Sequence, residues 1–146
     1  SKILDVLPEN AQVSEETMTK PEEALEFVEK TGIDLFAPAV GNIHGMVKGG
    51  DPKLDIERIG AIKKEIKIPL VLHGASGNTE EELRNAIEAG ISIIHINTEI
   101  RLAYKQALQK FFIENSDEIA PYKFLRSPLQ EMQSVIEKKL SLFNSL

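Results

Sequence analysis

The chain has 146 residues, of which 42% are hydrophobic and 27% charged, and its net charge is −6. This length and composition are typical of a globular domain, or of part of a larger one, with a hydrophobic core. The negative charge disfavours nucleic acid and anionic lipid as partners, and no apolar run approaches the ~20 residues that cross a bilayer. Without cysteine the chain has no disulfide or thiolate chemistry, and together with an N-terminus unlike a secretory signal this favours a cytoplasmic protein.

Taken in chain order, the sequence predicts helices alternating with short apolar strands. Pro21 near the first turn and Gly32 at the end delimit the first helix, and a capping box of Thr79 and Glu82 opens a later one. A second capping box, Ser127 with Gln130, opens the terminal helix. The expected elements are helix 20–32, strand 33–41, helix 54–66, strand 68–74, helix 79–90, strand 91–97, helix 98–113 and helix 127–143.

The order of these elements predicts the fold class. Nearly continuous apolar strands separated by amphipathic helices are typical of a parallel sheet covered by helices, joined by right-handed crossovers. We therefore expect an α/β architecture. In this class of fold, ligands bind outside the carboxyl ends of the strands.

Three histidines fall near the expected carboxyl ends of the three strands: His44 in "VGNIHG", His73 in "VLHGASG" and His95 in "IIHIN". Each of them has an alternative as a hydrogen-bonded structural residue. Neutral imidazoles are common zinc ligands, and a catalytic zinc needs three protein ligands and one open position. His44 and His73, each followed by glycine, are candidates for two of these ligands, whereas His95 is either a polar residue of the core or part of the site wall.

Two loops of small residues follow the second and third strands and indicate an anion site. "HGASGNTEEE" offers unobstructed backbone N–H groups, the Ser76 hydroxyl and a helix N-terminus. "INTEIR" offers Asn97, Thr98 and, one turn later, Arg101. The alternative for the first loop is a tight turn made by Gly74 and Gly77. Lys48, on the glycine-rich loop after His44, is either a solvated lysine or a contact for a negative charge.

Four segments together resemble the C-terminal half of class II, metal-dependent ketose-bisphosphate aldolases. They are "GIDLFAPAVGNIHGMVKG", "LDIERIGAIKKEIKIPLVLHGASG", "AIEAGISIIHINTEIR" and "KFLRSPLQEMQSVIEKKLSLFNS". The resemblance implies that residues 1–146 are the C-terminal part, about three strands plus helices, of a single TIM (β/α)8 barrel domain. It also implies a homo-oligomer, a dimer or tetramer, when the protein is complete.

The resemblance also assigns roles to individual residues. It implies that His44 and His73 bind Zn²⁺ or another divalent metal. It implies that the phosphate of dihydroxyacetone phosphate is held by the loops that contain Gly45 and Gly74 and by the Asn97–Thr98 turn. The substrate-binding residues it implies are Gly45, Lys48, Gly74, Ala75, Ser76, Asn97, Thr98 and Arg101. The family usually has asparagine where His95 stands, and its third metal histidine and proton-transferring aspartate lie in an earlier "HLDH"-like motif that this chain lacks, so we expect no catalytic proton-transfer residue here.

The implied activity is a carbon–carbon lyase reaction of glycolysis and gluconeogenesis. Zinc-dependent cleavage of fructose 1,6-bisphosphate would give dihydroxyacetone phosphate and glyceraldehyde 3-phosphate, with the metal stabilising negative charge on the substrate oxygens. Two alternatives remain: a tagatose-bisphosphate aldolase and a non-catalytic sugar-phosphate-binding module. We expect the 146-residue chain alone to lack aldolase activity, because two histidines leave a catalytic zinc one protein ligand short.

Overall fold

A computed structural model of the chain describes residues 6–7, 14–43, 46–47 and 53–144. The chain forms two compact units, Ser1–Ile96 and Asn97–Leu146, and each is described by itself. In these ranges no helix has the length and apolar character needed to cross a membrane.

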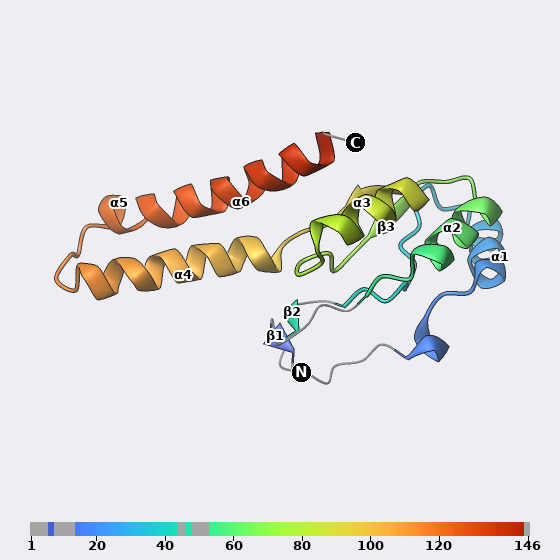
Figure 1. The fold of residues 1–146 in the computed structure, drawn as a ribbon, viewed down its shortest axis with the longest axis horizontal. Helices are drawn as coiled ribbons and strands as arrows, with labels where there is room; N and C mark the ends of the chain where they lie inside the picture. Colours follow the sequence, from blue (N-terminus) through green and yellow to red (C-terminus); the bar gives the residue numbers. More distant parts are fainter. Residues whose placement is uncertain (1–5, 8–13, 44–45, 48–52, 145–146) are drawn as a thin grey trace. The chain divides into compact units, whose positions relative to one another are not determined.

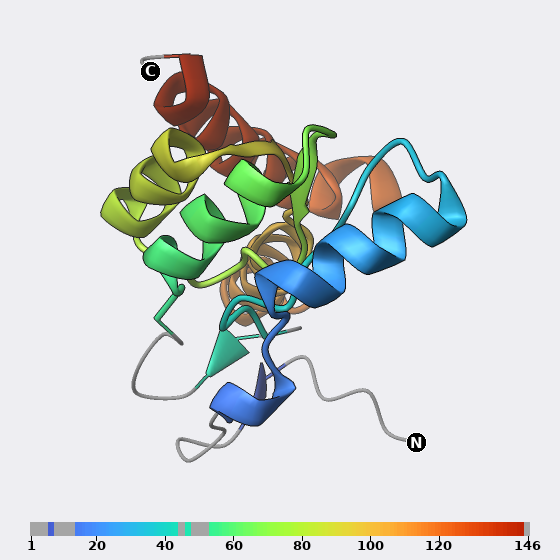
Figure 2. The ribbon, with the colours of Figure 1, turned by 90° about the vertical axis from the view of Figure 1, so that its right-hand side faces the viewer.

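The first unit contains a short 3-10 helix, η1 (Glu15–Thr17), and three longer helices, α1 (Pro21–Thr31), α2 (Ile56–Glu65) and α3 (Glu80–Ala89). α2 packs against both α1 and α3 (Figure 2). Local signals set their ends: α1 stops at Gly32, whose φ of 64° is left-handed, and Thr79 and Glu82 form a reciprocal capping box on α3. The predicted bounds of these three helices are therefore confirmed to within two residues.

The strands of the first unit pair in parallel, as the alternating pattern predicts. β3 (Leu70–Leu72) pairs with β4 (Ile91–Ile94), and α3 connects them. A second pair that the sequence did not indicate joins β1 (Val6–Leu7) to β2 (Met46–Val47), also in parallel. Helix-connected parallel strands confirm the α/β class, while the pairing described is limited to these short sheets and one isolated bridge.

The strand expected at residues 33–41 is reduced to that bridge, in which Phe36 pairs with Leu70 in parallel. The Phe36 N–H donates to Pro69 O at 3.1 Å, and Phe36 O accepts from the Val71 N–H at 2.8 Å. Farther along, the backbone takes partners outside the sheet, since Ala39 exchanges two hydrogen bonds with Thr19. Pro38, which has no N–H, lies between these regions. The prediction of a full strand here was wrong, although the place of the segment beside β3 was right.

The core of the first unit lies between the helices and the β3–β4 pair. Apolar side chains of α2 and α3 are buried, and so are all three residues of β3. Burial of such side chains is the main source of stability, at roughly 1.5–3 kcal/mol for each large one. The largest fully buried apolar residues of this unit are Val40, Ile59, Ile62, Ile66, Leu70, Leu72 and Leu83.

The second unit consists of helices α4 (Thr98–Glu114), α5 (Pro121–Phe124) and α6 (Arg126–Asn144). α4 and α6 run antiparallel and lie side by side (Figure 1), with an ion pair of 3.2 Å between Lys139 and Glu99. The predicted capping box at Ser127 was wrong, because α6 has already begun at Arg126. Leu125 keeps a helical backbone between α5 and α6, so the chain needs no new cap, and Pro128 is tolerated in the first turn of α6.

Candidate functional site

Two of the three histidines, His73 and His95, come together at the carboxyl ends of neighbouring strands. His73 follows β3 directly and His95 follows β4. The His95 N–H donates to Leu72 O at 2.9 Å, which extends the ladder by one bond. Within this chain His73 is half-buried and His95 is exposed. The predicted site residues His44, Gly45 and Lys48 lie outside the described residues.

The two imidazoles contact each other edge to face. Their rings are inclined at 88° with centroids 4.4 Å apart, and the two Nδ1 atoms are separated by 3.3 Å. A hydrogen bond between them needs one Nδ1 that carries a proton and one that does not, so the donor and acceptor roles depend on the tautomers. The two histidines are 22 positions apart in the chain, and the pairing of β3 with β4 brings them together.

Imidazole nitrogens are common ligands of divalent metals, so the type of donor at this edge of the sheet suits a metal. Within the described ranges, however, no three or more His, Cys, Asp or Glu side chains gather in a geometry that would hold a metal ion. A metal bound at this edge would need further ligands from outside the described residues.

Asn42 is a site-adjacent residue that sequence reasoning missed. Its side-chain Nδ2 donates to the backbone oxygen of His73 at 2.9 Å, and its Oδ1 accepts from the Val40 N–H at 2.9 Å. The first bond joins the turn after the Phe36 segment to the end of β3, across 31 residues. The only hint in the sequence was its place in "VGNIHG", two residues before a candidate ligand.

The loop after His73 forms a tight turn with two left-handed glycines. Gly74 has a φ of 67° and Gly77 a φ of 97°, values that glycine adopts without strain. Ala75, Ser76 and Asn78 are buried, so these side chains turn into the protein. The turn predicted as the alternative for this loop is present, and a phosphate would have to approach the loop through its backbone N–H groups.

The carboxylate of Glu82 holds this loop to its surroundings. Glu82 Oε2 accepts from the Thr79 N–H at 3.1 Å and lies 3.5 Å from Asn78 Nδ2, while Oε1 accepts from the Leu54 N–H at 3.3 Å. The first turn of α3 also carries Glu80 and Glu81. The carboxylates of these three glutamates already interact with the positive end of the helix dipole, and they would repel a phosphate placed there. The backbone of the glycine turn is therefore a better phosphate site than the N-terminus of α3.

A backbone hydrogen bond holds together the two ends of the segment between Val40 and Asp55, which includes Asn42. The Asp55 N–H donates to Val40 O at 2.9 Å. Burial by itself raises the pKa of the Asp55 carboxyl, but hydrogen bonds from the Arg58 backbone and guanidinium, together with its charge, bring the pKa below the ordinary value. Arg58 Nε lies 2.8 Å from Asp55 Oδ2. The ionised carboxylate caps α2 and fixes where this segment returns to the fold.

The remaining predicted substrate contacts belong to the second unit. Asn97 precedes α4 as its N-cap residue, Thr98 is the first residue of the helix, and the Arg101 N–H donates to Asn97 O at 3.1 Å. Asn97 and Arg101 are exposed. They lie two to six residues beyond His95 in the chain and open a helix, as predicted.

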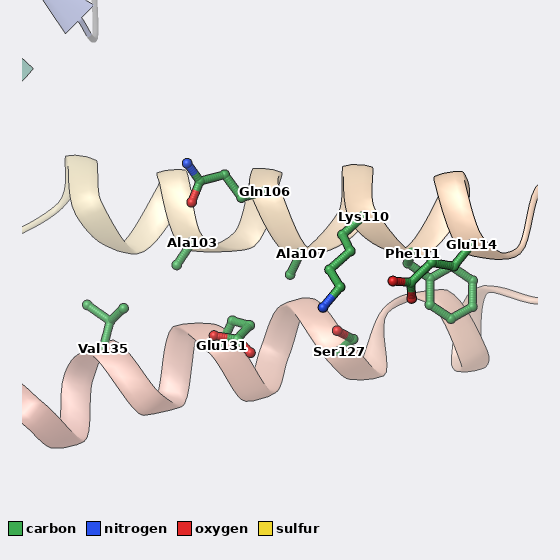
Figure 3. Close-up of a pocket in the computed structure, with 9 residues that line it drawn as sticks. All are labelled: Ala103, Gln106, Ala107, Lys110, Phe111, Glu114, Ser127, Glu131 and Val135. Carbon is green, nitrogen blue, oxygen red and sulfur yellow. The ribbon is translucent and has the colours of Figure 1, made fainter. Parts of the chain in front are cut away.

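A pocket of about 490 Å³ lies between α4 and α6 (Figure 3). Lys110 and Glu114 reach into it from α4, and Ser127 and Glu131 from α6. The other lining residues are Ala103, Gln106, Ala107, Phe111 and Val135. None of the predicted site residues lines this pocket, and all of its lining residues belong to α4 and α6, so it is a gap in the packing of these two helices.

Comparisons with known proteins identify the family and the fold. A family model described as "Fructose-bisphosphate aldolase class-II" matches residues 5–146. The crystal structure of the YdjI aldolase from Escherichia coli K12 is similar at 34% identity and a TM-score of 0.71, over 86% of this chain and 44% of that one. A putative fructose-1,6-biphosphate aldolase from Coccidioides immitis is 32% identical, with a TM-score of 0.73, over 88% and 44%.

A third structure, the fructose-bisphosphate aldolase of Campylobacter jejuni, shares the fold at a TM-score of 0.73 and 24% identity, over 88% of this chain and 46% of that one. The chain thus spans less than half the length of each of these three proteins.

Proposed function

This chain belongs to the class II fructose-bisphosphate aldolase family, and we propose that it is the C-terminal part of a cytoplasmic, metal-dependent aldolase that cleaves fructose 1,6-bisphosphate. The proposal includes the finer fold, in which the parallel strands belong to a (β/α)8 barrel whose remaining strands lie in the rest of the protein. The observation that carries the function is the pair of imidazoles at the ends of β3 and β4, directly beside a turn of small residues. Metal and phosphate chemistry meet at this edge of the sheet.

In this proposal His73 binds the metal, and a second ligand comes from His44. Zn²⁺ or another divalent metal bound there supplies Lewis-acid polarisation of the substrate carbonyl. His95, exposed beside His73, forms the wall of the site and orients the imidazole. The proton-transfer group is contributed from outside this chain.

Substrate positioning is the second role of these residues. The backbone of the Gly74–Gly77 turn binds one phosphate group of the sugar, with Gly45, Ala75 and Ser76 shaping its surroundings. Asn97, Thr98, Arg101 and Lys48 complete the binding of the sugar phosphate. Interactions with phosphates remote from the reacting carbons lower the barrier by fixing the substrate in the reactive geometry.

Assembly into a homo-oligomer is part of the same proposal. Large apolar side chains stay exposed on the second unit, such as Ile113 at 84% and Ile119 at 88%, and burial between copies would remove them from water. Light scattering of the complete protein should give the mass of a dimer or tetramer, and a monomer at micromolar concentration would contradict this part of the proposal.

The test of the function is an aldol cleavage assay with the complete protein, in which release of triose phosphate is coupled to a dehydrogenase. Cleavage of fructose 1,6-bisphosphate should be abolished by EDTA and restored by Zn²⁺ or another divalent metal. Faster cleavage of tagatose 1,6-bisphosphate would reassign the substrate. Binding of the sugar bisphosphate without cleavage of either compound would support a binding module and refute the proposal.

A further inference from the structure

We propose that Asn42 is a positioning residue, which fixes the peptide unit between His73 and Gly74 and thereby the directions of the His73 side chain and the Gly74 N–H. The inference rests on the proposed function, in which His73 binds a metal and the Gly74 turn binds phosphate. It assigns a role to a residue outside the predicted ligand and substrate sets.

Both polar atoms of the Asn42 side-chain amide make a hydrogen bond, and only one orientation of the amide allows both bonds. Oδ1 faces the Val40 N–H, which is a donor, and Nδ2 faces the His73 carbonyl, which is an acceptor, each at 2.9 Å. The reversed amide would place donor against donor and acceptor against acceptor, so only the observed orientation satisfies both partners. A side chain held at both ends in this way presents its N–H group to His73 in a fixed direction.

The His73 carbonyl lies just beyond the β3–β4 ladder. The last bond of that ladder is made one residue earlier, by Leu72 O with the His95 N–H. Past this point the chain turns left-handed at Gly74, with a φ of 67°. Sheet pairing therefore fixes the chain up to Leu72, and the bond from Asn42 holds the next peptide unit.

That peptide unit needs a restraint because glycine makes it easy to rotate. Glycine adopts positive and negative φ alike, so both forms that differ by a rotation of about 180° of the preceding peptide unit are possible at Gly74. Such a rotation would move the His73 carbonyl to the side of the chain on which the Gly74 N–H now lies, and the Gly74 N–H to the side of the carbonyl. Asn42 stabilises one of the two forms.

The restraint acts on both proposed binding groups at once. In a trans peptide the C=O and the N–H point in opposite directions, so a carbonyl held by Asn42 directs the Gly74 N–H away from Asn42. The same bond fixes the backbone that carries the His73 imidazole. Groups that hold metal ligands in place typically change metal affinity by about 10–100-fold when they are removed.

The experiment measures Zn²⁺ affinity of the complete protein by competition with a chromophoric chelator. Asn42→Ala removes both hydrogen bonds, and Asn42→Ser, which can keep only one of them, serves if the alanine variant does not fold. The matched control is Asn115→Ala, because Asn115 Nδ2 also donates to a backbone carbonyl, Phe111 O at 3.1 Å, at the end of α4. Thermal unfolding without metal measures the purely structural loss in each variant.

We expect the zinc dissociation constant to rise at least tenfold for the Asn42 variant and to stay within twofold for Asn115→Ala, although both lose thermal stability. An Asn42 variant that binds zinc within twofold of the wild type would overturn the inference, as would an equal loss in both variants. His73→Ala separates this result from the proposed function. If zinc is lost with His73→Ala but kept by the Asn42 variant, the inference fails alone; if His73→Ala keeps its zinc, the proposed function fails.

Discussion

Replacement of Glu82 by alanine tests the organisation of the loop after His73. The carboxylate accepts from two backbone N–H groups, those of Thr79 and Leu54, at 3.1 and 3.3 Å. Each of these bonds contributes about 1 kcal/mol net in a partly exposed setting, and the first is also half of the capping box on α3. We expect Glu82→Ala to lower the free energy of unfolding by about 2 kcal/mol relative to a control that matches its change in charge.

The control is Glu81→Ala, an exposed carboxylate in the same helical turn. Both substitutions remove one negative charge from the N-terminus of α3, a loss of about 0.3–1 kcal/mol each, and both gain the same helix propensity. The difference between them therefore isolates the hydrogen bonds of Glu82. Urea denaturation of the complete protein gives the two free energies. If Glu82→Ala costs no more than Glu81→Ala, the proposed hydrogen-bonded anchor of the loop is refuted.

Three further predictions concern other residues of the first unit. The pKa of Asp55 is lower in the fold than in the unfolded chain, so its contribution to stability is complete above about pH 5 and is lost as the pH falls through the folded pKa. Asp55→Asn should therefore flatten the acid dependence of the thermal unfolding temperature, and an unchanged pH profile would contradict this. Gly41→Ala should destabilise by at least about 2 kcal/mol, since φ is 94° and the new Cβ would lie 2.5 Å from Lys53 O; a smaller loss in urea denaturation would count against this close approach. Ser76→Ala should leave the KM for fructose 1,6-bisphosphate within about twofold, because the Ser76 side chain is buried and the proposed phosphate contacts are backbone N–H groups; a rise of roughly tenfold, the effect of one hydrogen bond to a charged group, would contradict this.

Helix ends were predictable because the residues that set them are neighbours in the sequence. Gly32 stops α1, and Thr79 with Glu82 opens α3, all within one helical turn. The failed capping box at Ser127 had the same local pattern, but the chain there was already helical through Leu125. A capping motif predicts a helix start only when the preceding residues leave the helical conformation.

Long-range contacts explain what the sequence did not predict. The segment at 33–41 has the composition of a buried strand, but Ala39 bonds to Thr19, 20 residues away, in place of a neighbouring strand. Asn42 meets His73 across 31 residues and gives no periodic signal. His95 could be placed beside His73 because parallel strands bring their carboxyl ends to one edge. Thus the sequence predicts the edge of the sheet at which His73 and His95 lie. It does not predict the hydrogen bond from Asn42 to the His73 backbone.

The zinc content of the purified complete protein, compared between the wild type and His73→Ala, tests the central claim most directly. Elemental analysis after dialysis against metal-free buffer should give about one zinc per wild-type chain, as a single catalytic site requires. The His73→Ala variant should retain almost none while it keeps a cooperative unfolding transition. A folded variant with the same zinc content as the wild type would contradict the assignment of His73 as a metal ligand.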